Sequence, residues 1–186
     1  KMLNLDWNKL PGLDVSNMTT LTELHCDNGS TSFDYDFTSL NVQGCTNLTK
    51  LICTDNLLIS LNLSNLTNLN YLDCSGNSDV FTDTGLQSIA LQNCSSLKSI
   101  YAGYNPYLLE LDLSCSSNYT IVGIYNCTRL QRVNLKNGVN ESSLYNGVFN
   151  TTNNGCPNLH LICIDFNETF ASATNSGVAQ SPYYNF

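Results

Sequence analysis

The side chains of this sequence that could bind a metal or take part in catalysis are nine cysteines, two histidines and fifteen acidic residues. A zinc site would have to use Cys156, His160 and Cys163, with Asp165 as a fourth ligand. The spacing C-x3-H-x2-C is not a zinc pattern, and residues 160 and 163 point to opposite faces of a strand because they are an odd number apart. We therefore predict no zinc site in this segment and no cofactor for the chain.

Calcium could use acidic residues in two polar stretches, Asp34 with Asp36 and Asp79 with Asp83. Neither pair belongs to the spaced run of oxygen ligands that defines a known calcium loop. We expect ordinary solvated acidic loops there, with calcium binding as the open alternative.

Catalysis by a nucleophile needs a base beside it. His25 and His160 are the only histidines and lie near opposite ends of the chain, so no Ser-His-Asp set can form around both. A glycosidase needs two carboxyl groups at a fixed separation, and the repeat described below puts the candidate aspartates at different positions: Asp6, Asp27, Asp55 and Asp73. We predict that the protein is not an enzyme, with a polysaccharide-active β-solenoid as the least favoured alternative.

Leucine repeats must position all of these side chains. The stretch 48–69 reads LTKLICTDNLLISLNLSNLTNL. Its first half fits the pattern L-x-x-L-x-C-x-x-N-x-L, and its second half repeats the same spacing of leucines. One coil thus has a main half-turn and a return half-turn, with a base period of 21 residues. The marker leucine or its equivalent in each main half-turn is Leu3, Leu24, Leu51, Leu72, Ile100, Val133 and Ile162.

The two apolar residues of L-x-L lie on one face of a strand, and the Asn closes the corner by bonding backbone groups. Because one coil cannot bury its apolar edge alone, neighbouring coils stack. Seven coils at about 4.8 Å each give a rod of about 34 Å. We predict a single domain over 1–186, with a truncated first coil (1–12), insertions at 30–38, 78–85 and 115–120, an irregular stretch at 136–154 and a C-terminal cap (168–186).

Most of the cysteines fall into two repeated positions. Cys26, Cys53 and Cys74 share an inward position of the main half-turn, and a second set is assigned to the return half-turn: Cys45, Cys94, Cys127 and Cys156. Free cysteine behaves as a small hydrophobe in a core, so we predict packing, with disulfides as the alternative. The pair to consider is Cys115 with Cys127, which bracket an expected insertion.

The composition excludes some partners. The net charge is −8 at pH 7, which disfavours a phosphate backbone and an anionic membrane surface. No stretch approaches the roughly 20 apolar residues of a membrane span. The chain begins inside a coil, so we expect a mature or excised domain.

The repeats resemble bacterial leucine-rich repeat proteins of the 21-residue, cysteine-containing type with a nested half-repeat. The match covers roughly residues 3–167 and is most specific over 40–72. The resemblance implies a leucine-rich repeat solenoid, mostly β, with stacked parallel strands, irregular convex segments and loop insertions. It also implies a secreted, extracellular or cell-surface protein that uses the domain for binding.

We expect binding on the concave sheet, where outward side chains flank the inward leucines. The candidates are His25, Lys50, Tyr71, Asp73, Tyr101, Tyr104 and Arg132, and the outward positions of the last coil are Leu161 and Cys163. Tyrosine is an amphipathic anchor at interfaces and can stack on sugar rings. The predicted function is a non-enzymatic module that binds an unknown protein or glycan at the bacterial surface. A structural spacer or adhesin stalk is the alternative.

Overall fold

The computed structural model describes residues 1–8, 10–29, 37–79, 81, 83–138 and 155–165, and the backbone of 179–181. Within these ranges the elements are β-strands and there is no helix, so none of the described elements is a helix that could cross a membrane. Six strands form one parallel sheet, which we call the main sheet. In order they are β1 (Met2–Asn4), β3 (Glu23–His25), β5 (Lys50–Ile52), β7 (Tyr71–Asp73), β11 (Ser99–Tyr101) and β13 (Ile121–Gly123).

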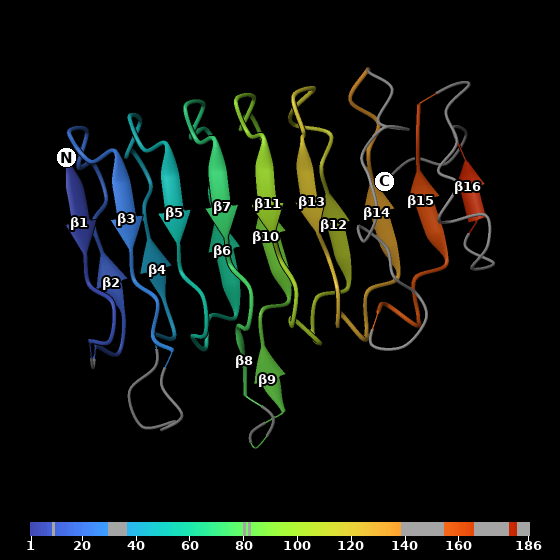
Figure 1. The fold of residues 1–186 in the computed structure, drawn as a ribbon, viewed down its shortest axis with the longest axis horizontal. Coiled ribbons are helices and arrows are strands. Elements are labelled where there is room, and N and C mark those ends of the chain that lie inside the picture. Colours follow the sequence, from blue (N-terminus) through green and yellow to red (C-terminus); the bar gives the residue numbers. More distant parts are fainter. Residues whose placement is uncertain are drawn as a thin grey trace.

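Up to residue 134 the remaining parallel strands alternate with those of the main sheet along the chain, and two more follow. We call all of them the return strands. They pair as β2 (Leu13–Asp14) with β4 (Leu40–Asn41), as β6 (Ser60–Asn62) with β10 (Ser88–Ala90), and in the series β12 (Glu110–Asp112), β14 (Arg132–Asn134), β15 (Leu161–Cys163) and β16 (Ala179–Ser181). The chain therefore coils in a solenoid-like manner, with neighbouring strands side by side along the long axis in Figure 1.

One short hairpin departs from the coil. Strands β8 (Ser78–Asp79) and β9 (Thr84–Gly85) pair antiparallel and extend beyond the stacked strands in Figure 1. This confirms an insertion at 78–85. The expected insertion at 30–38 lies mostly outside the described residues.

The core lies between the main sheet and the return strands. Most three-residue strands bury the central residue and turn its two neighbours outward, since side chains alternate. The exceptions are Leu3, which is only partly buried, and Asn134 and Cys163, which are buried beside the central residue. Leu24, Leu51 and Leu72 are directly paired in register and have no exposed surface. Leu61 and Leu111 close the core from the return side. Each such leucine contributes about 1.5–3 kcal/mol by burial.

Buried asparagines close the corners after main strands β5, β7 and β11. The amide nitrogens of Asn56 and Asn77 donate to the carbonyls of Cys26 and Cys53, on the preceding coil, at 2.8 and 2.9 Å. The Asn77 amide oxygen accepts the backbone N–H of Leu58 at 3.2 Å. Asn105 continues the column. This confirms the predicted role of asparagine at the corner.

The repeat after residue 113 differs from our prediction. Val122, not Val133, is the central residue of the next main strand, and β14 around Val133 pairs with return strand β12. Residues 115–120 are therefore the ordinary connection between β12 and β13 rather than an insertion. Ser116 and Tyr119 take the positions of Leu66 and Leu69 in this connection, and both are buried.

The cysteines pack as predicted for the first set and differently for part of the second. Cys26, Cys53 and Cys74 have no exposed surface. All nine thiols are free, and Cys115 and Cys127 lie in turns at opposite edges of a coil, so the structure does not support their pairing. Cys163, expected to face outward, is buried.

The predicted C-terminal cap contains a further strand. Residues 179–181 form β16, which pairs in parallel with β15, so the return strands continue beyond the predicted last coil. The other residues of 168–186 lie outside the described residues.

Candidate functional site

Four tyrosines gather on the outward face of the main sheet, and we call Tyr71, Tyr101, Tyr104 and Tyr125 the tyrosine cluster. Tyr71 on β7 and Tyr101 on β11 lie with ring centroids 5.6 Å apart and planes tilted by 43°. Tyr104 and Tyr125, in the turns after β11 and β13, meet edge to face at 5.0 Å and 87°. The first three are predicted binding candidates, and the structure adds the fourth.

Asp73 provides the negative charge of this cluster. Burial raises the pKa of Tyr71 and of Tyr125. In both cases the second largest cause is the negative charge of the Asp73 carboxylate, which raises the pKa further. Their hydroxyls therefore stay protonated around neutral pH and keep a hydrogen-bond donor. One carboxylate oxygen of Asp73 accepts the backbone N–H of Ser75 at 3.1 Å, which fixes its orientation. The surface thus combines aromatic faces, hydroxyl donors and a carboxylate acceptor.

Two glycines make room for the rings. A β-carbon at Gly123 would lie 2.9 Å from the Tyr101 ring, and one at Gly103 would lie 2.7 Å from the Tyr125 ring. Each tyrosine covers the backbone of the coil that carries the other. This reciprocal packing holds both rings against the sheet.

Lys50 borders the cluster on β5. Its ammonium nitrogen lies 5.5 Å from the centroid of the Tyr71 ring, within the range of a cation–π contact. The structure thus brings together Lys50, Tyr71, Asp73, Tyr101 and Tyr104 of the predicted candidates.

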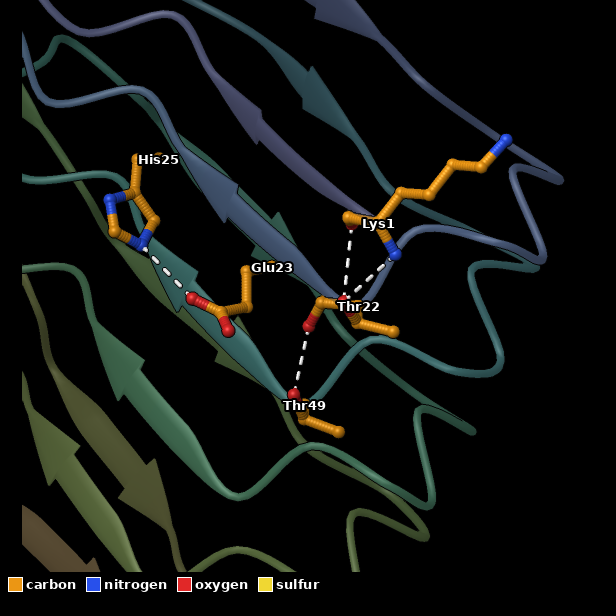
Figure 2. A network of polar contacts seen from close by, with 5 residues as sticks. All are labelled: Lys1, Thr22, Glu23, His25 and Thr49. Carbon is orange, nitrogen blue, oxygen red and sulfur yellow. Dashed lines mark hydrogen bonds and ion pairs between the residues drawn. The ribbon is translucent and has the colours of Figure 1, made fainter.

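His25 does not join the cluster. Its ring turns toward Glu23 of the same strand, with Nε2 3.8 Å from a carboxylate oxygen (Figure 2). The side chain is only 15% exposed, and Nε2 has no hydrogen-bond partner. Figure 2 also shows Thr22 and Thr49 joined on neighbouring coils by a 2.9 Å hydrogen bond. The Thr22–Thr49 bond joins the coils of β3 and β5, and the low exposure of His25 leaves it little contact with solvent.

Arg132 lies on the other side of the protein from the position we predict. It belongs to β14, among the return strands, and its guanidinium lies 3.4 Å from a carboxylate oxygen of Glu110 on β12. Leu161 on β15 is likewise a return-strand residue. The misplaced repeat boundary after residue 113 explains both corrections.

Comparisons of the chain with protein-family models, with curated proteins and with solved structures find no match. The function must therefore be argued from the residues themselves.

Tyr104 adopts a backbone conformation that a bulky residue rarely takes. Its φ is +55°, at a corner where other coils have Trp7, Asp55, Gly76 and Asn126, all with positive φ. Asparagine, aspartate and glycine tolerate this left-handed region, whereas larger side chains are strained in it. Tyr104 is nevertheless 53% exposed, so burial does not compensate the strain. Strained residues can mark functional sites, but Trp7 shares this conformation and is also exposed, so Tyr104 is assigned to the site by its contact with Tyr125.

Sequence reasoning missed Tyr125 because it followed the wrong repeat boundary. With Val122 as the central residue, Tyr125 lies at the same repeat position as Ser75 and Gly103. A repeat alignment that accepts Ser116 and Tyr119 in leucine positions would have placed Tyr125 on this face.

The structure offers little for metal binding or catalysis within its described part. No group of three histidine, cysteine, aspartate or glutamate side chains gathers there. Asp79 is buried and accepts the backbone N–H of Phe81 at 2.8 Å, and Asp83 accepts the Tyr107 hydroxyl at 2.6 Å. The other predicted calcium pair, Asp34 and Asp36, lies outside the described residues.

A hollow of about 620 Å³ lies among the turns that follow return strands β6, β10 and β12. Its only charged lining residue is Asp112, which already accepts the Ser114 N–H and the Asn134 amide, both at 2.9 Å. Both bonds fall on Oδ1 of this single carboxylate, and no second carboxylate or histidine among the described residues lines the hollow, so the tyrosine cluster is the stronger candidate site.

Proposed function

We propose that this protein is a non-enzymatic binding module that recognises a short saccharide through the tyrosine cluster. The observation that supports this most is the grouping of four aromatic rings and one carboxylate on adjacent coils of the main sheet. Aromatic faces stack on the apolar faces of sugar rings, while phenol hydroxyls and the Asp73 carboxylate bond sugar hydroxyls.

The size of the cluster favours a saccharide over a protein. It extends over three coils, or about 10 Å at the spacing of parallel strands. A standard protein interface covers about 800 Å² on each partner, which would extend well beyond a cluster of this length. The net charge of −8 also favours a neutral ligand over an anionic one. A protein that anchors on the same tyrosines is the second candidate.

We further propose that the fold is of the bacterial leucine-rich repeat type and that the module acts at the cell surface. In-register parallel strands at Leu3, Leu24, Leu51 and Leu72 support the repeat type. Leu3 and Leu24 are 21 residues apart in the sequence, and so are Leu51 and Leu72. The cell-surface assignment comes from the resemblance of the repeats alone.

A glycan array probed with the purified protein, with and without calcium, tests the proposal. We expect a specific hit that loses at least tenfold in affinity in Tyr71→Ala and in Tyr101→Ala. Trp7→Ala is the matched control, because Trp7 is also a highly exposed aromatic but lies at the first coil. The control should bind like the wild type.

Other results would redirect the proposal. A calcium-dependent hit that ignores the tyrosines would move the site to the acidic insertions. A blank glycan array together with a protein hit sensitive to Tyr101→Ala would establish the second candidate. Blank glycan and protein arrays would leave a spacer or stalk, and turnover of a polysaccharide would show an enzyme.

A further inference from the structure

The buried asparagine column of the main-strand corners ends in two cysteines. Asn105, Cys127 and Cys156 each lie six residues before the central residue of a return strand: Leu111, Val133 and Ile162. Asn105 donates to the Cys74 carbonyl at 3.0 Å, and the Cys127 thiol lies 3.2 Å from the equivalent Ala102 carbonyl. The two cysteines thus replace asparagine in one column, not in the return position that the sequence suggested.

The two thiols are neighbours. Strands β14 and β15 pair in register, with Val133 opposite Ile162, so the two corners belong to adjacent coils. Parallel strands lie about 4.8 Å apart, within the Cα separation of about 4.4–6.8 Å that disulfides require. The Cys127 thiol lies 3.2 Å from the Ala102 carbonyl and the Cys156 thiol 3.9 Å from the Ile124 carbonyl, so the two thiols occupy equivalent positions on adjacent coils, and both side chains are fully buried.

The other column of cysteines provides a contrast. Cys26 and Cys74 direct their thiols to the backbone carbonyls of Ile52 and Tyr101, at 3.4 and 3.5 Å. The thiol of Cys53 between them is fully buried in the core. These thiols fill space beside paired strands. Cys127 and Cys156 also lie near backbone carbonyls, those of Ala102 and Ile124 at 3.2 and 3.9 Å, but they stack at a corner, and each thiol shifts the pKa of the other.

We propose that Cys127 and Cys156 form a disulfide between adjacent coils when the chain folds in the presence of a low-molecular-weight disulfide. The bond would tie together the two ends of the segment 127–156.

The chemistry is a thiol–disulfide exchange in two steps. The Cys156 thiolate attacks the donor disulfide, forms a mixed disulfide and releases one donor thiolate. The Cys127 sulfur, having lost its proton to solvent, then attacks the Cys156 sulfur and releases the second. The protein loses two protons and two electrons, and the donor is reduced to two thiols. The interaction between the two thiols lowers the pKa of Cys156 and raises the pKa of Cys127, which favours this order.

Refolding of the full chain in a buffer of reduced and oxidised glutathione tests the proposal, because the folded thiols are buried and slow to react. Remaining thiols are alkylated, and the protein is digested without reduction for mass spectrometry. We expect a cross-linked peptide pair containing Cys127 and Cys156, with the other seven cysteines alkylated. Nine alkylated cysteines, or Cys53–Cys74 cross-links at equal yield, would overturn the proposal.

A thermal measurement provides the second test. Oxidised wild-type protein should melt about 5 °C or more above the reduced form, because the cross-link restricts the unfolded chain. Cys127→Asn restores the residue type of the column, so it should fold and show no such difference. Cys74→Ser, the control, should keep the difference. A difference that survives in Cys127→Asn would refute the assignment of the bond.

Discussion

The ring of Tyr125 covers the backbone of Gly103, and a β-carbon at residue 103 would lie 2.7 Å from the ring. The backbone at Gly103 does not have the positive φ that would itself require glycine. The glycine is therefore needed for the ring and not for the chain conformation.

Gly103→Ala should consequently displace Tyr125 and leave the fold intact. We expect a changed near-ultraviolet circular dichroism signal, a several-fold loss of any ligand affinity, and a stability change below about 1 kcal/mol, because the ring can move. Gly138→Ala is the contrasting control. Gly138 has φ +85° and nothing within 4 Å of its β-carbon position, so that variant should lose about 1 kcal/mol with an unchanged aromatic signal. An unaltered aromatic signal in Gly103→Ala would contradict the packing.

Asn77→Ala should destabilise the protein by about 2–3 kcal/mol. The Asn77 side chain has no exposed surface and bonds the carbonyls of Cys53 and Cys74 and the N–H of Leu58. Its loss leaves buried backbone groups without partners, and each such group is costly. Denaturant unfolding of Asn68→Ala provides the control, because the Asn68 amide makes a similar 2.8 Å bond to the Thr46 carbonyl but is exposed. Equal losses in the two variants would show that burial is not the cause.

Asp83→Ala should release the β8–β9 hairpin and spare the coils. Asp83 accepts the Tyr107 hydroxyl at 2.6 Å and the Arg129 guanidinium at 3.4 Å, and that guanidinium lies 4.6 Å from the centroid of the Tyr107 ring. We expect faster amide hydrogen exchange in residues 78–85, with protection of Leu72 and Ile100 unchanged. Tyr107→Phe removes the same hydroxyl bond and should have the same local effect. Loss of protection throughout the main sheet would show a wider role for these contacts.

The first half of the fold could be predicted because its leucines are nearly unbroken. The periodic leucines placed Leu24, Leu51 and Leu72 at the centres of paired strands, and asparagine marked the corners. Outward positions followed from the alternation of side chains in a strand, so Lys50, Tyr71, Asp73 and Tyr101 were placed on the right face.

The second half could not be predicted in the same way because polar residues take core positions there. Ser116 is buried and satisfies its hydroxyl with the Leu97 carbonyl at 2.7 Å. Tyr119 is buried with its hydroxyl 3.2 Å from the Cys115 sulfur. Neither compensation is visible in a sequence pattern. The apolar pattern around Val133 was therefore assigned to the main sheet, which misplaced Arg132 and concealed Tyr125.

Alkaline pH should weaken the fold through its buried thiols. Burial, with smaller contributions from Asp6 and Asp27, raises the pKa of Cys26 from 9.0 to about 12. Above pH 9 the unfolded chain therefore loses this proton while the folded protein keeps it. The folded state then binds more protons, so stability falls as pH rises from about 9 to 12, by up to about 1.4 kcal/mol per pH unit for this thiol.

Denaturant unfolding at pH 7.5 and 10.5, in the presence of a reductant, measures this effect. Other groups also titrate in that range, so the comparison that matters is between wild type and Cys26→Ala. Between the two pH values, the stability advantage of wild type over the variant should shrink by about 2 kcal/mol. Asn68→Ala, which leaves every thiol in place, should follow the wild-type pH dependence. An advantage that is the same at both pH values would mean that Cys26 ionises in the folded protein as readily as in the unfolded chain, and its burial would then have to be incomplete in solution.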